Sequence, residues 1–193
     1  MQTLIQSIEQ FHSNDPQEIA DREAILQAIA MDGARTLTRE NLLFHFTASS
    51  IIVDPSRTKT LMAYHNIYQS WAWTGGHTDG DSDLLAVALK EANEESGVTG
   101  LRPLSDAPIS LEVLHVVRHI KRGKPVPSHV HLNLTYALEA DDTLPLRIKP
   151  DENARVGWLD IADVPRLVSE PTMIPIYHKI LSRILGRSAF DLP

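Results

Sequence analysis

The chain has 193 residues, of which 42% are hydrophobic, and this length and composition fit one globular domain with a sizeable core. It contains no cysteine, which excludes disulfides and thiolate chemistry, and its formal net charge of -7 argues against a nucleic-acid polymer as the main partner. No basic stretch followed by an apolar run opens the chain, and no run of about 18 apolar residues occurs, so we expect a cytoplasmic protein without a membrane partner.

The first 30 residues predict two helices. Apolar residues recur at helical spacing over 2–12, and Asp15 followed by Pro16 predicts the N-cap and first position of a second helix over 16–30. The two helices are predicted to form a helical hairpin. We therefore divide the chain into an N-terminal helical extension over 1–40 and a main domain over 41–193. The apolar stripe of this hairpin is predicted to pack on the core, and a homodimer contact is the alternative.

Strands are predicted over 42–53 and 60–65, where β-branched and apolar residues predominate. The turn-rich sequence DPSRT between them predicts a hairpin. Trp71 and Trp73 alternate on a further strand. One of the two rings is therefore expected in the core, and the other is free to stack on a ligand ring.

A helix is predicted to begin between Asp81 and Asp83, where Asp81 or Ser82 could cap its free amides, and to stop at Gly97. Its buried face is formed by apolar residues at helical spacing. These are Leu84, Leu85, Ala88, Leu89 and Ala92.

Three carboxylates, those of Glu91, Glu94 and Glu95, share the last turn of this helix. At about 100° per residue they lie on one face, so they would repel one another unless a cation or a base lay among them. The C-terminal end of a helix already presents negative charge from its backbone carbonyls. Three carboxylates that are merely solvated would therefore be unfavourable at this end. The cluster predicts a site for a hard divalent cation.

Two more strands are predicted over 111–120 and 129–138, flanking the loop KRGKPVPS. The second alternates apolar with polar residues, so one face is expected to be apolar and the other polar. His129 and His131 share the polar face, where such a pair can bind a transition metal, although hydrogen bonding is the alternative without a third ligand. A short strand over 156–159 and a helix over 173–185 follow. Interleaved strands and helices predict an α/β protein with a mixed sheet between helices.

The segment from residue 76 to residue 98 resembles the Nudix box, G-x5-E-x7-R-E-U-x-E-E-x-G-U, in which U is aliphatic. The matching positions are Gly76, Glu91, Ala92, Glu94, Glu95, Gly97 and Val98. Ser82 stands where the family has its first Glu, and Lys90 stands where it has Arg. Lysine keeps the charge but loses the planar fork, so we expect Lys90 to pair with Asp81 or Asp83 instead.

Three further stretches resemble a bacterial branch of the Nudix hydrolase superfamily that has a GGHxDGD loop. They are HFTASSIIVDP, WAWTGGHTDGD and HVHLNLTYAL. The resemblance implies a Nudix-type α/β/α sandwich with a mixed β-sheet and an N-terminal helical extension. It also implies metal-dependent hydrolysis of the diphosphate bond of a nucleoside diphosphate derivative or a related small pyrophosphate.

By the same resemblance, the metal ligands are Glu91, Glu94, Glu95 and the backbone carbonyl of Gly76 or its neighbour, holding Mg²⁺ or, alternatively, Mn²⁺. Glu94 is a further ligand or orients the water, and Glu95 belongs with it to the catalytic set. The resemblance adds Glu152 as a ligand or general base, and its loop position leaves room for this reach. Asp151 is its rival.

The predicted substrate-binding residues are His77, His129, His131 and Arg118. His77 lies beside the glycine loop, and Arg118 opens a basic run that could contact substrate phosphates or be only solvated. The alternative function is a non-catalytic nucleotide-binding or metabolite-binding regulatory module on the same fold. An isopentenyl diphosphate isomerase, which shares this fold, resembles the chain less because its chemistry uses a cysteine.

Overall fold

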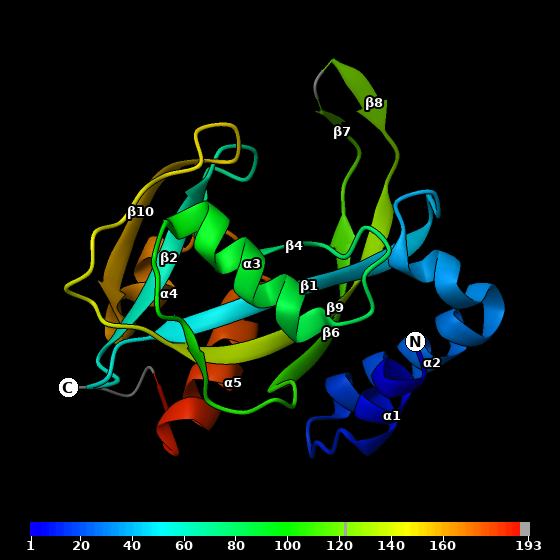
Figure 1. The fold of residues 1–193 in the computed structure, drawn as a ribbon, viewed down its shortest axis with the longest axis horizontal. Helices are drawn as coiled ribbons and strands as arrows, with labels where there is room; N and C mark the ends of the chain where they lie inside the picture. Colours follow the sequence, from blue (N-terminus) through cyan, green and yellow to red (C-terminus); the bar gives the residue numbers. More distant parts are fainter. Residues whose placement is uncertain (122, 190–193) are drawn as a thin grey trace.

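The computed structural model describes residues 1–121 and 123–189. Arg122 of the predicted loop and residues 190–193 of the predicted main domain lie outside this description. The described chain forms a mixed eight-stranded sheet with helices on both faces, together with a small two-stranded ribbon (Figure 1). The α/β class predicted from the sequence is confirmed.

The helices are α1 (Gln2–Gln10), α2 (Pro16–Asp32), η1 (Gly33–Leu37), α3 (Leu84–Ser96), η2 (Ile161–Asp163), α4 (Val164–Leu167) and α5 (Ile174–Leu185). The strands are β1 (Phe44–Val53), β2 (Lys59–His65), β3 (Ser70–Ala72), β4 (Thr74–His77), β5 (Arg102–Pro103), β6 (Ser110–Val116), β7 (His119–Lys121), β8 (Lys124–Val126), β9 (His129–Glu139) and β10 (Asn153–Asp160). No helix in the described ranges is long and apolar enough to cross a membrane.

The sheet runs in the order β10-β2-β1-β9-β5, with β3 paired to β2, β4 to β1 and β6 to β9. Only β1 and β9 are parallel, with His45 beside His131, whereas the other pairs are antiparallel. The predicted hairpin of β1 and β2 is present, with Ile52 opposite Leu61. The mixed sheet places β1 at the centre, where both of its faces are covered.

Successive side chains of β1 enter two different hydrophobic clusters, as the alternation of a strand requires. Phe46 joins a cluster with Ala88 of α3 and Ile8 of α1. Ile51 joins a second cluster with Tyr177 of α5. Helix α3 therefore covers one face of the sheet and α5 covers the other (Figure 1).

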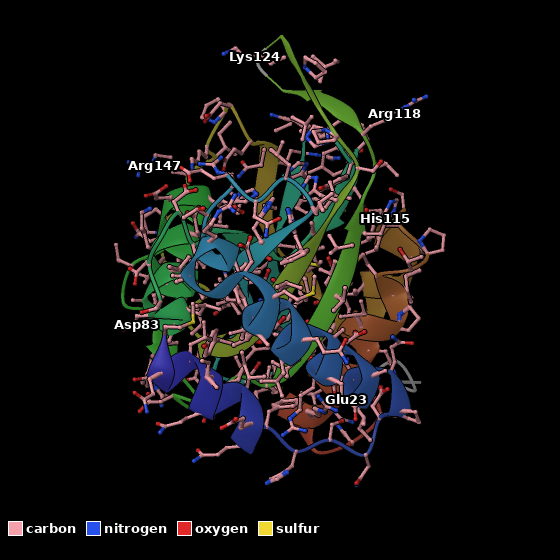
Figure 2. The ribbon with its side chains drawn as sticks, turned by 90° about the vertical axis from the view of Figure 1, so that its right-hand side faces the viewer. Glu23, Asp83, His115, Arg118, Lys124 and Arg147 are labelled. Atoms are coloured by element: carbon pink, nitrogen blue, oxygen red, sulfur yellow. The ribbon has the colours of Figure 1, made fainter. Side chains whose placement is uncertain are left out.

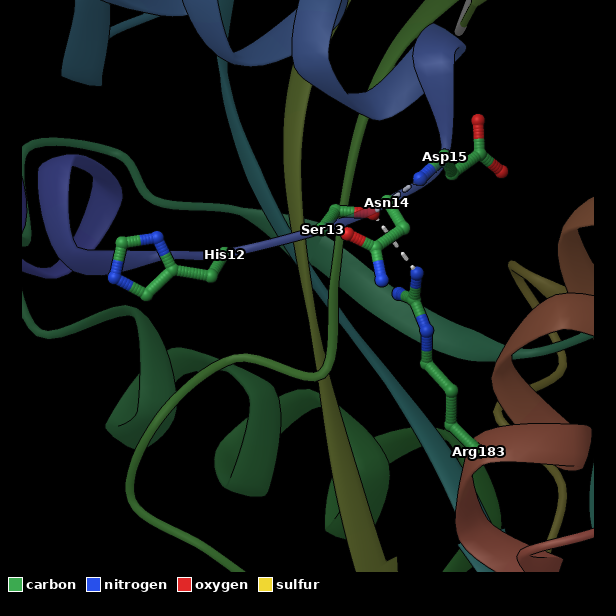
Figure 3. A pocket seen from close by; sticks show the side chains of 5 residues that line it. All are labelled: His12, Ser13, Asn14, Asp15 and Arg183. Atoms are coloured by element: carbon green, nitrogen blue, oxygen red, sulfur yellow. Dashed lines mark hydrogen bonds between the residues drawn. The ribbon is translucent and has the colours of Figure 1, made fainter.

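The N-terminal helices pack on the body of the protein through the predicted apolar stripe, since Leu4 and Ile8 are buried. Asp15 caps α2 by accepting hydrogen bonds from the backbone N–H groups of Gln17 and Glu18, as predicted. Figure 3 shows Arg183 of α5 reaching the loop between the helices, where its Nη2 donates to the Oγ of Ser13 at 3.1 Å. The stripe is thus used within the chain.

The predicted strand over 111–120 is wrong in its second half. Strand β6 pairs with β9 only as far as Val116 opposite His129. The segment after β6 and the segment before β9 leave the sheet together. They pair with each other as the ribbon β7–β8, which carries Lys124 (Figure 2). The predicted loop therefore contains a strand of its own.

The polar face predicted for β9 is also buried, because the helix α5 lies over it. Asn133 and Thr135 have no exposed area. The Oδ1 of Asn133 accepts hydrogen bonds from the hydroxyls of Thr47 at 2.9 Å and Ser49 at 2.8 Å. Polar alternation here marks a satisfied internal network rather than contact with water.

The two tryptophans are both half-buried against the second cluster. The ring of Trp73 meets that of Tyr177 edge-on at 5.4 Å. The ring of Trp71 meets that of Tyr64 at 5.7 Å and has the guanidinium of Arg155 at 5.2 Å from its centroid. Both rings therefore already have partners within the protein.

Candidate functional site

Helix α3 positions the acidic residues, and its two ends are fixed by side chain and backbone geometry. Asp83 is the N-cap, accepting a hydrogen bond from the backbone N–H of Ala86 at 3.0 Å. The cap predicted at Asp81 or Ser82 is wrong, because the Oδ1 of Asp81 accepts from the backbone N–H of Asp83 before the helix begins. Gly97 ends the helix at φ +70°, a conformation that favours glycine.

Three carboxylates converge from two separate segments. Glu91 and Glu95 of α3 and Glu152 of the loop before β10 each offer an oxygen, and these oxygens lie within 4.8 Å of one another. The side chain of Asn153 donates to the backbone oxygen of Glu95 at 2.9 Å, which ties this loop to the end of α3. Because Glu91 and Glu95 are also buried, the cluster is held in place by the fold.

Strand β4 lies against this cluster at two residues without side chains, Gly75 and Gly76. A Cβ at residue 76 would stand 2.5 Å from the Cδ of Glu91, so any larger residue there would push the carboxylate of Glu91 out of its position. The backbone N–H of Gly75 donates to the Oε1 of Glu95 at 3.4 Å. The glycines thus let the backbone approach the carboxylates closely, which a simple turn would not require.

Glu94 is not one of the three converging carboxylates, but it shares a cation with two of them. Its Oε2 is 3.0 Å from the Nζ of Lys149, and its side chain is 40% exposed. The same Nζ lies 3.0 Å from the Oε2 of Glu152 and 3.9 Å from that of Glu91. Lys149 is therefore the base among the carboxylates, and the sequence analysis missed it. Its spacing of three residues before Glu152 was the available signal.

The charges in the cluster are only partly balanced. Burial raises the pKa of Glu95 to about 8, and the nearby charge of Glu152 adds to the rise. Burial also raises the pKa of Glu91, against the attraction of Lys149. The hydrogen bond from Lys149 instead lowers the pKa of Glu94. The ammonium of Lys149 therefore leaves the two buried carboxylates, those of Glu91 and Glu95, in need of more positive charge.

The pairing predicted for Lys90 is wrong. Its Nζ lies 3.8 Å from Glu91 and 3.7 Å from Glu94, and within the described ranges it forms no ion pair with Asp81 or Asp83. The reason is geometric, because Asp83 caps the start of α3 and Lys90 lies seven residues later, about 10 Å along the axis.

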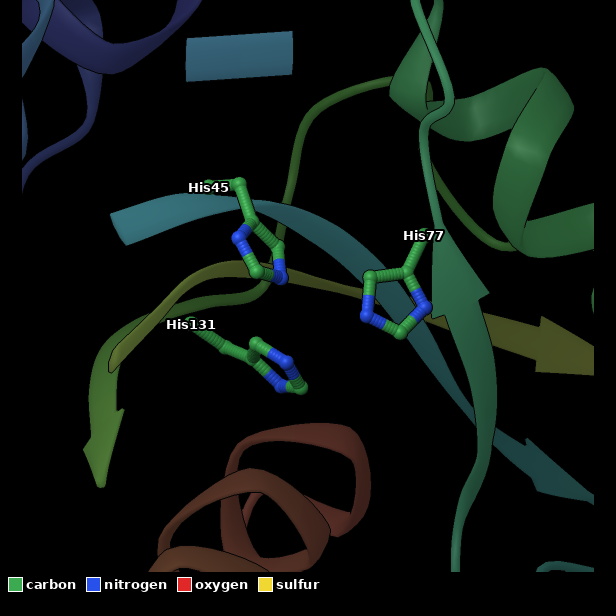
Figure 4. A group of neighbouring side chains, drawn as sticks. All are labelled: His45, His77 and His131. Atoms are coloured by element: carbon green, nitrogen blue, oxygen red, sulfur yellow. The ribbon is translucent and has the colours of Figure 1, made fainter. Parts of the chain in front are cut away.

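The predicted histidines meet at one end of the sheet, together with one that the sequence analysis did not single out. Nitrogens of His45, His77 and His131 lie within 4.8 Å of one another (Figure 4). The Nε2 of His129 is 3.2 Å from the Nε2 of His131. His45 joins them through the parallel pairing of β1 with β9, a long-range register that no local pattern reveals.

Arg118 lies at the base of the ribbon, and its side chain points outward from it (Figure 2). Its backbone N–H donates to the Oγ of Ser128 at 3.1 Å. Its predicted contact with substrate stays a prediction, as do the roles predicted for Gly76, Glu94 and the histidines.

Comparison with solved structures identifies the fold. An Ap4A hydrolase from C. elegans is 18% identical, with a TM-score of 0.54 over 72% of this chain and 97% of its own. A Nudix family hydrolase from Clostridium perfringens gives 18% and 0.52 over the same shares of the two chains. A putative Nudix hydrolase from Listeria monocytogenes gives 12% and 0.51 over 73% of this chain and 94% of its own.

No family model and no curated protein matches the chain. At these identities the structural likeness establishes the fold alone. The Nudix-type sandwich predicted from the sequence is therefore confirmed.

Proposed function

We propose that this protein is a Nudix-type, metal-dependent hydrolase that cleaves the phosphoanhydride bond of a nucleoside diphosphate derivative or a related small pyrophosphate. The observation that carries the proposal is the convergence of Glu91, Glu95 and Glu152 against a glycine strand. The neighbours in fold whose names describe them as hydrolases, among them an Ap4A hydrolase, support the same class of reaction.

The donor set fits Mg²⁺, with Mn²⁺ as the alternative. Its side chains offer only oxygen atoms, which hard cations prefer, and the rise in pKa of the buried Glu95 marks a place where added positive charge is stabilising. Glu91, Glu95 and Glu152 would hold the ion, with the carbonyl of Gly76 as a further ligand. When bound, the ion neutralises charge on the phosphate oxygens and on the leaving group.

The chain's own residues have separate roles in this proposal. Glu95 keeps its position through the N–H of Gly75 and through the anchored end of α3. Glu94 and Glu152 share the ammonium of Lys149, which holds both carboxylates at the rim of the cluster, where a water molecule can be oriented. Glu152 is the proposed additional ligand or general base, and Asp151 is its rival.

Several further assignments belong to the proposal. They are membership of the branch with the GGHxDGD loop, substrate contacts by His77, His129, His131 and Arg118, a location in the cytoplasm, and a helical extension over 1–40 before a main domain over 41–193. A homodimer remains the alternative use of the extension. The proposed partner is a small nucleotide or pyrophosphate molecule.

A non-catalytic binding module on the same fold is the second candidate. The position of Lys149 favours it, because one ammonium within 3.0 Å of both Glu94 and Glu152 offsets part of the charge that a metal would neutralise. Ser82 and Lys90 in place of the family residues point in the same direction.

The two candidates are separated by a release assay over nucleotide sugars, dinucleoside polyphosphates, nucleoside triphosphates and ADP-ribose, with Mg²⁺ and with a chelator. We expect hydrolysis of at least one compound, dependent on the metal and lost in Glu95→Gln. Glu23→Gln, at an exposed position of α2, is the matched control and should keep full activity. Hydrolysis that survives the chelator contradicts the proposal, and binding of a nucleotide without hydrolysis of any compound supports the module.

A further inference from the structure

Four histidines lie together on the face of the sheet opposite the acidic cluster. Their rings are packed, with centroids 4.8 Å apart for His45 and His129 and 5.0 Å apart for His77 and His131. His77 follows Gly76 on β4, and neighbouring residues of a strand face opposite sides. Since the open side of Gly76 faces Glu91, the histidines form a group separate from the carboxylates.

The register of the sheet brings the group together. His45 and His131 are direct neighbours across the parallel pair β1–β9. His77 stands opposite Thr47 across the antiparallel pair β1–β4, next to His45 on the same face. As a result, one nitrogen from each of His45, His77 and His131 falls within 4.8 Å of the other two (Figure 4).

His45 has the local structure of a metal ligand. Its Nδ1 lies 2.9 Å from the backbone oxygen of Asn41, and because a carbonyl only accepts, Nδ1 carries the proton. Its Nε2 therefore presents a lone pair. The side chain is buried, and Nε2 has no hydrogen-bond partner in the part of the chain that is described. A histidine oriented by a backbone carbonyl on one nitrogen, with the other turned inward, is the usual arrangement at metal sites.

The support behind His45 is itself fixed. The side chain of Asn41 donates to Asp32 at 2.7 Å and accepts from the backbone N–H groups of Leu43 and Phe44 at 3.0 Å. Burial also lowers the pKa of His45. A hydrogen-bond network alone accounts for Nδ1 and leaves the buried Nε2 without a partner, which is costly.

His129 is also oriented by a backbone carbonyl, and it lies beside the three histidines as a neighbour of His131. Its Nδ1 lies 2.9 Å from the carbonyl oxygen of Pro127, so its Nε2 is the acceptor that faces the Nε2 of His131 at 3.2 Å. When His131 donates through that nitrogen, its Nδ1 keeps the lone pair. His129 thereby sets the form of His131, as outer partners of metal ligands do.

We propose that His45, His77 and His131 form a second metal site, which takes a transition metal of the zinc class through three imidazole nitrogens. Imidazole suits Zn²⁺, Co²⁺ and Ni²⁺ rather than Mg²⁺. Three protein ligands leave one position open, and the half-buried His77 and His131 give that position access to solvent. A site of this kind can take an oxygen atom of water or of a phosphate.

The test is a titration with Co²⁺, followed by its visible absorption, on protein without a polyhistidine tag and stripped with a chelator. The acidic cluster is silenced with Glu91→Gln/Glu95→Gln or, in wild type, with excess Mg²⁺, which does not compete for imidazole. We expect one equivalent of Co²⁺ bound in either case and displaced by Zn²⁺. The proposal does not depend on hydrolysis, so its outcome is independent of the proposed function.

Two variants remove single ligands. His77→Ala and His131→Ala should each weaken Co²⁺ binding by at least about 10-fold, while His115→Ala, at an exposed position of β6, should leave it unchanged. Circular dichroism confirms that each variant is folded before titration. Failure of wild-type protein to bind Co²⁺ in excess Mg²⁺, or binding that survives both variants, overturns the proposal.

Discussion

Two buried glutamates of this protein, Glu18 on α2 and Glu95 on α3, are surrounded in opposite ways. The side chain of Glu18 accepts hydrogen bonds from the guanidinium of Arg183 at 2.6 and 2.8 Å and lies 2.9 Å from the ammonium of Lys179. The Oγ of Ser110 also donates to it at 2.6 Å. Glu95 receives one backbone N–H at 3.4 Å and faces other carboxylates.

The pKa values of Glu18 and Glu95 differ in the direction that these surroundings predict. Burial by itself acts to raise the pKa of Glu18, but the hydrogen bonds from Arg183 and the nearby hydroxyls lower it to about 2. For Glu95, burial and the charge of Glu152 both act upward, to about 8. The fold completes the first site from its own residues and leaves the second short of positive charge. The first site is structural, and the second is where we expect function.

The largest effect should come from Glu95→Gln, which sharpens the comparison. Loss of residues that only support ligands typically costs about 10- to 100-fold, so loss of a direct ligand should lower turnover by more than about 100-fold. The metal-free protein should be no less stable, because a pKa of about 8 leaves Glu95 mostly protonated at pH 7 and glutamine replaces it with a neutral group of similar size. Turnover measures the expected loss of activity, and urea unfolding of the same preparation measures the expected stability. A variant that unfolds more easily and keeps its activity would reverse the contrast with Glu18.

Glu18→Gln should have the opposite profile, with stability lost and hydrolysis retained. Removing the Glu18 carboxylate leaves Arg183 without its carboxylate partner and leaves Lys179 with only that of Glu112 at 3.3 Å, at a cost of roughly 3 kcal/mol in the free energy of unfolding. Urea unfolding at pH 7 measures this loss. Glu23→Gln, at an exposed position of the same helix, is the control and should change it by less than about 0.5 kcal/mol.

The pH dependence of the same pair gives a sign as well as a size. The pKa of Glu18 is depressed from 4.5 to about 2 on folding, so its contribution to stability is present above 4.5 and is lost as pH falls toward 2. The difference in unfolding free energy between wild type and Glu18→Gln should therefore shrink between these two values. A difference that stays constant over this range would show that Glu18 is not the titrating group.

Lys149→Met tests whether the ammonium of Lys149, which lies close to two of the three carboxylates, competes with a metal ion. Its Nζ lies 3.0 Å from Glu152 and 3.9 Å from Glu91, so a bound divalent ion would feel its repulsion. We expect Mg²⁺ to bind about 5-fold more tightly to the variant, which corresponds to roughly 1 kcal/mol for a screened charge. Calorimetric titration measures the change. Weaker binding would mean that Lys149 organises the ligands rather than competing with the ion.

The sequence predicts the acidic helix well because its signals are local. The spacing of Glu91 and Glu95 and the stop at Gly97 need only helical geometry, and the resemblance of the segment adds the fold. The position of Lys149 was not predicted, since it depends on the contact between the loop before β10 and the end of α3, which are far apart in the sequence. His45 was missed for the same reason, because its neighbour His131 is set by strand register.

Some errors came from local rules applied where tertiary structure decides. Alternation over 129–138 predicted one apolar and one polar face, but it could not show that α5 buries the polar residues Asn133 and Thr135 in a hydrogen-bonded layer. The strand predicted over 111–120 was cut short where its partner ends, at Val116 opposite His129. Local propensity could reveal neither that α5 covers β9 nor that the pairing of β6 with β9 ends at Val116.

The smallest effect should come from Lys90→Ala. Its ammonium is 3.7 Å or more from Glu91 and Glu94, and its side chain is 65% exposed, so the interaction is weak and screened. We expect turnover to fall by less than about 3-fold, well below the loss that a family arginine in a tight pair would cause. Asp81→Asn should have its own small effect, and the double variant should lose the product of the two factors, because the residues share no contact. Kinetics of the four proteins measure this coupling. A double variant no worse than either single one would mean that Lys90 and Asp81 act as partners after all.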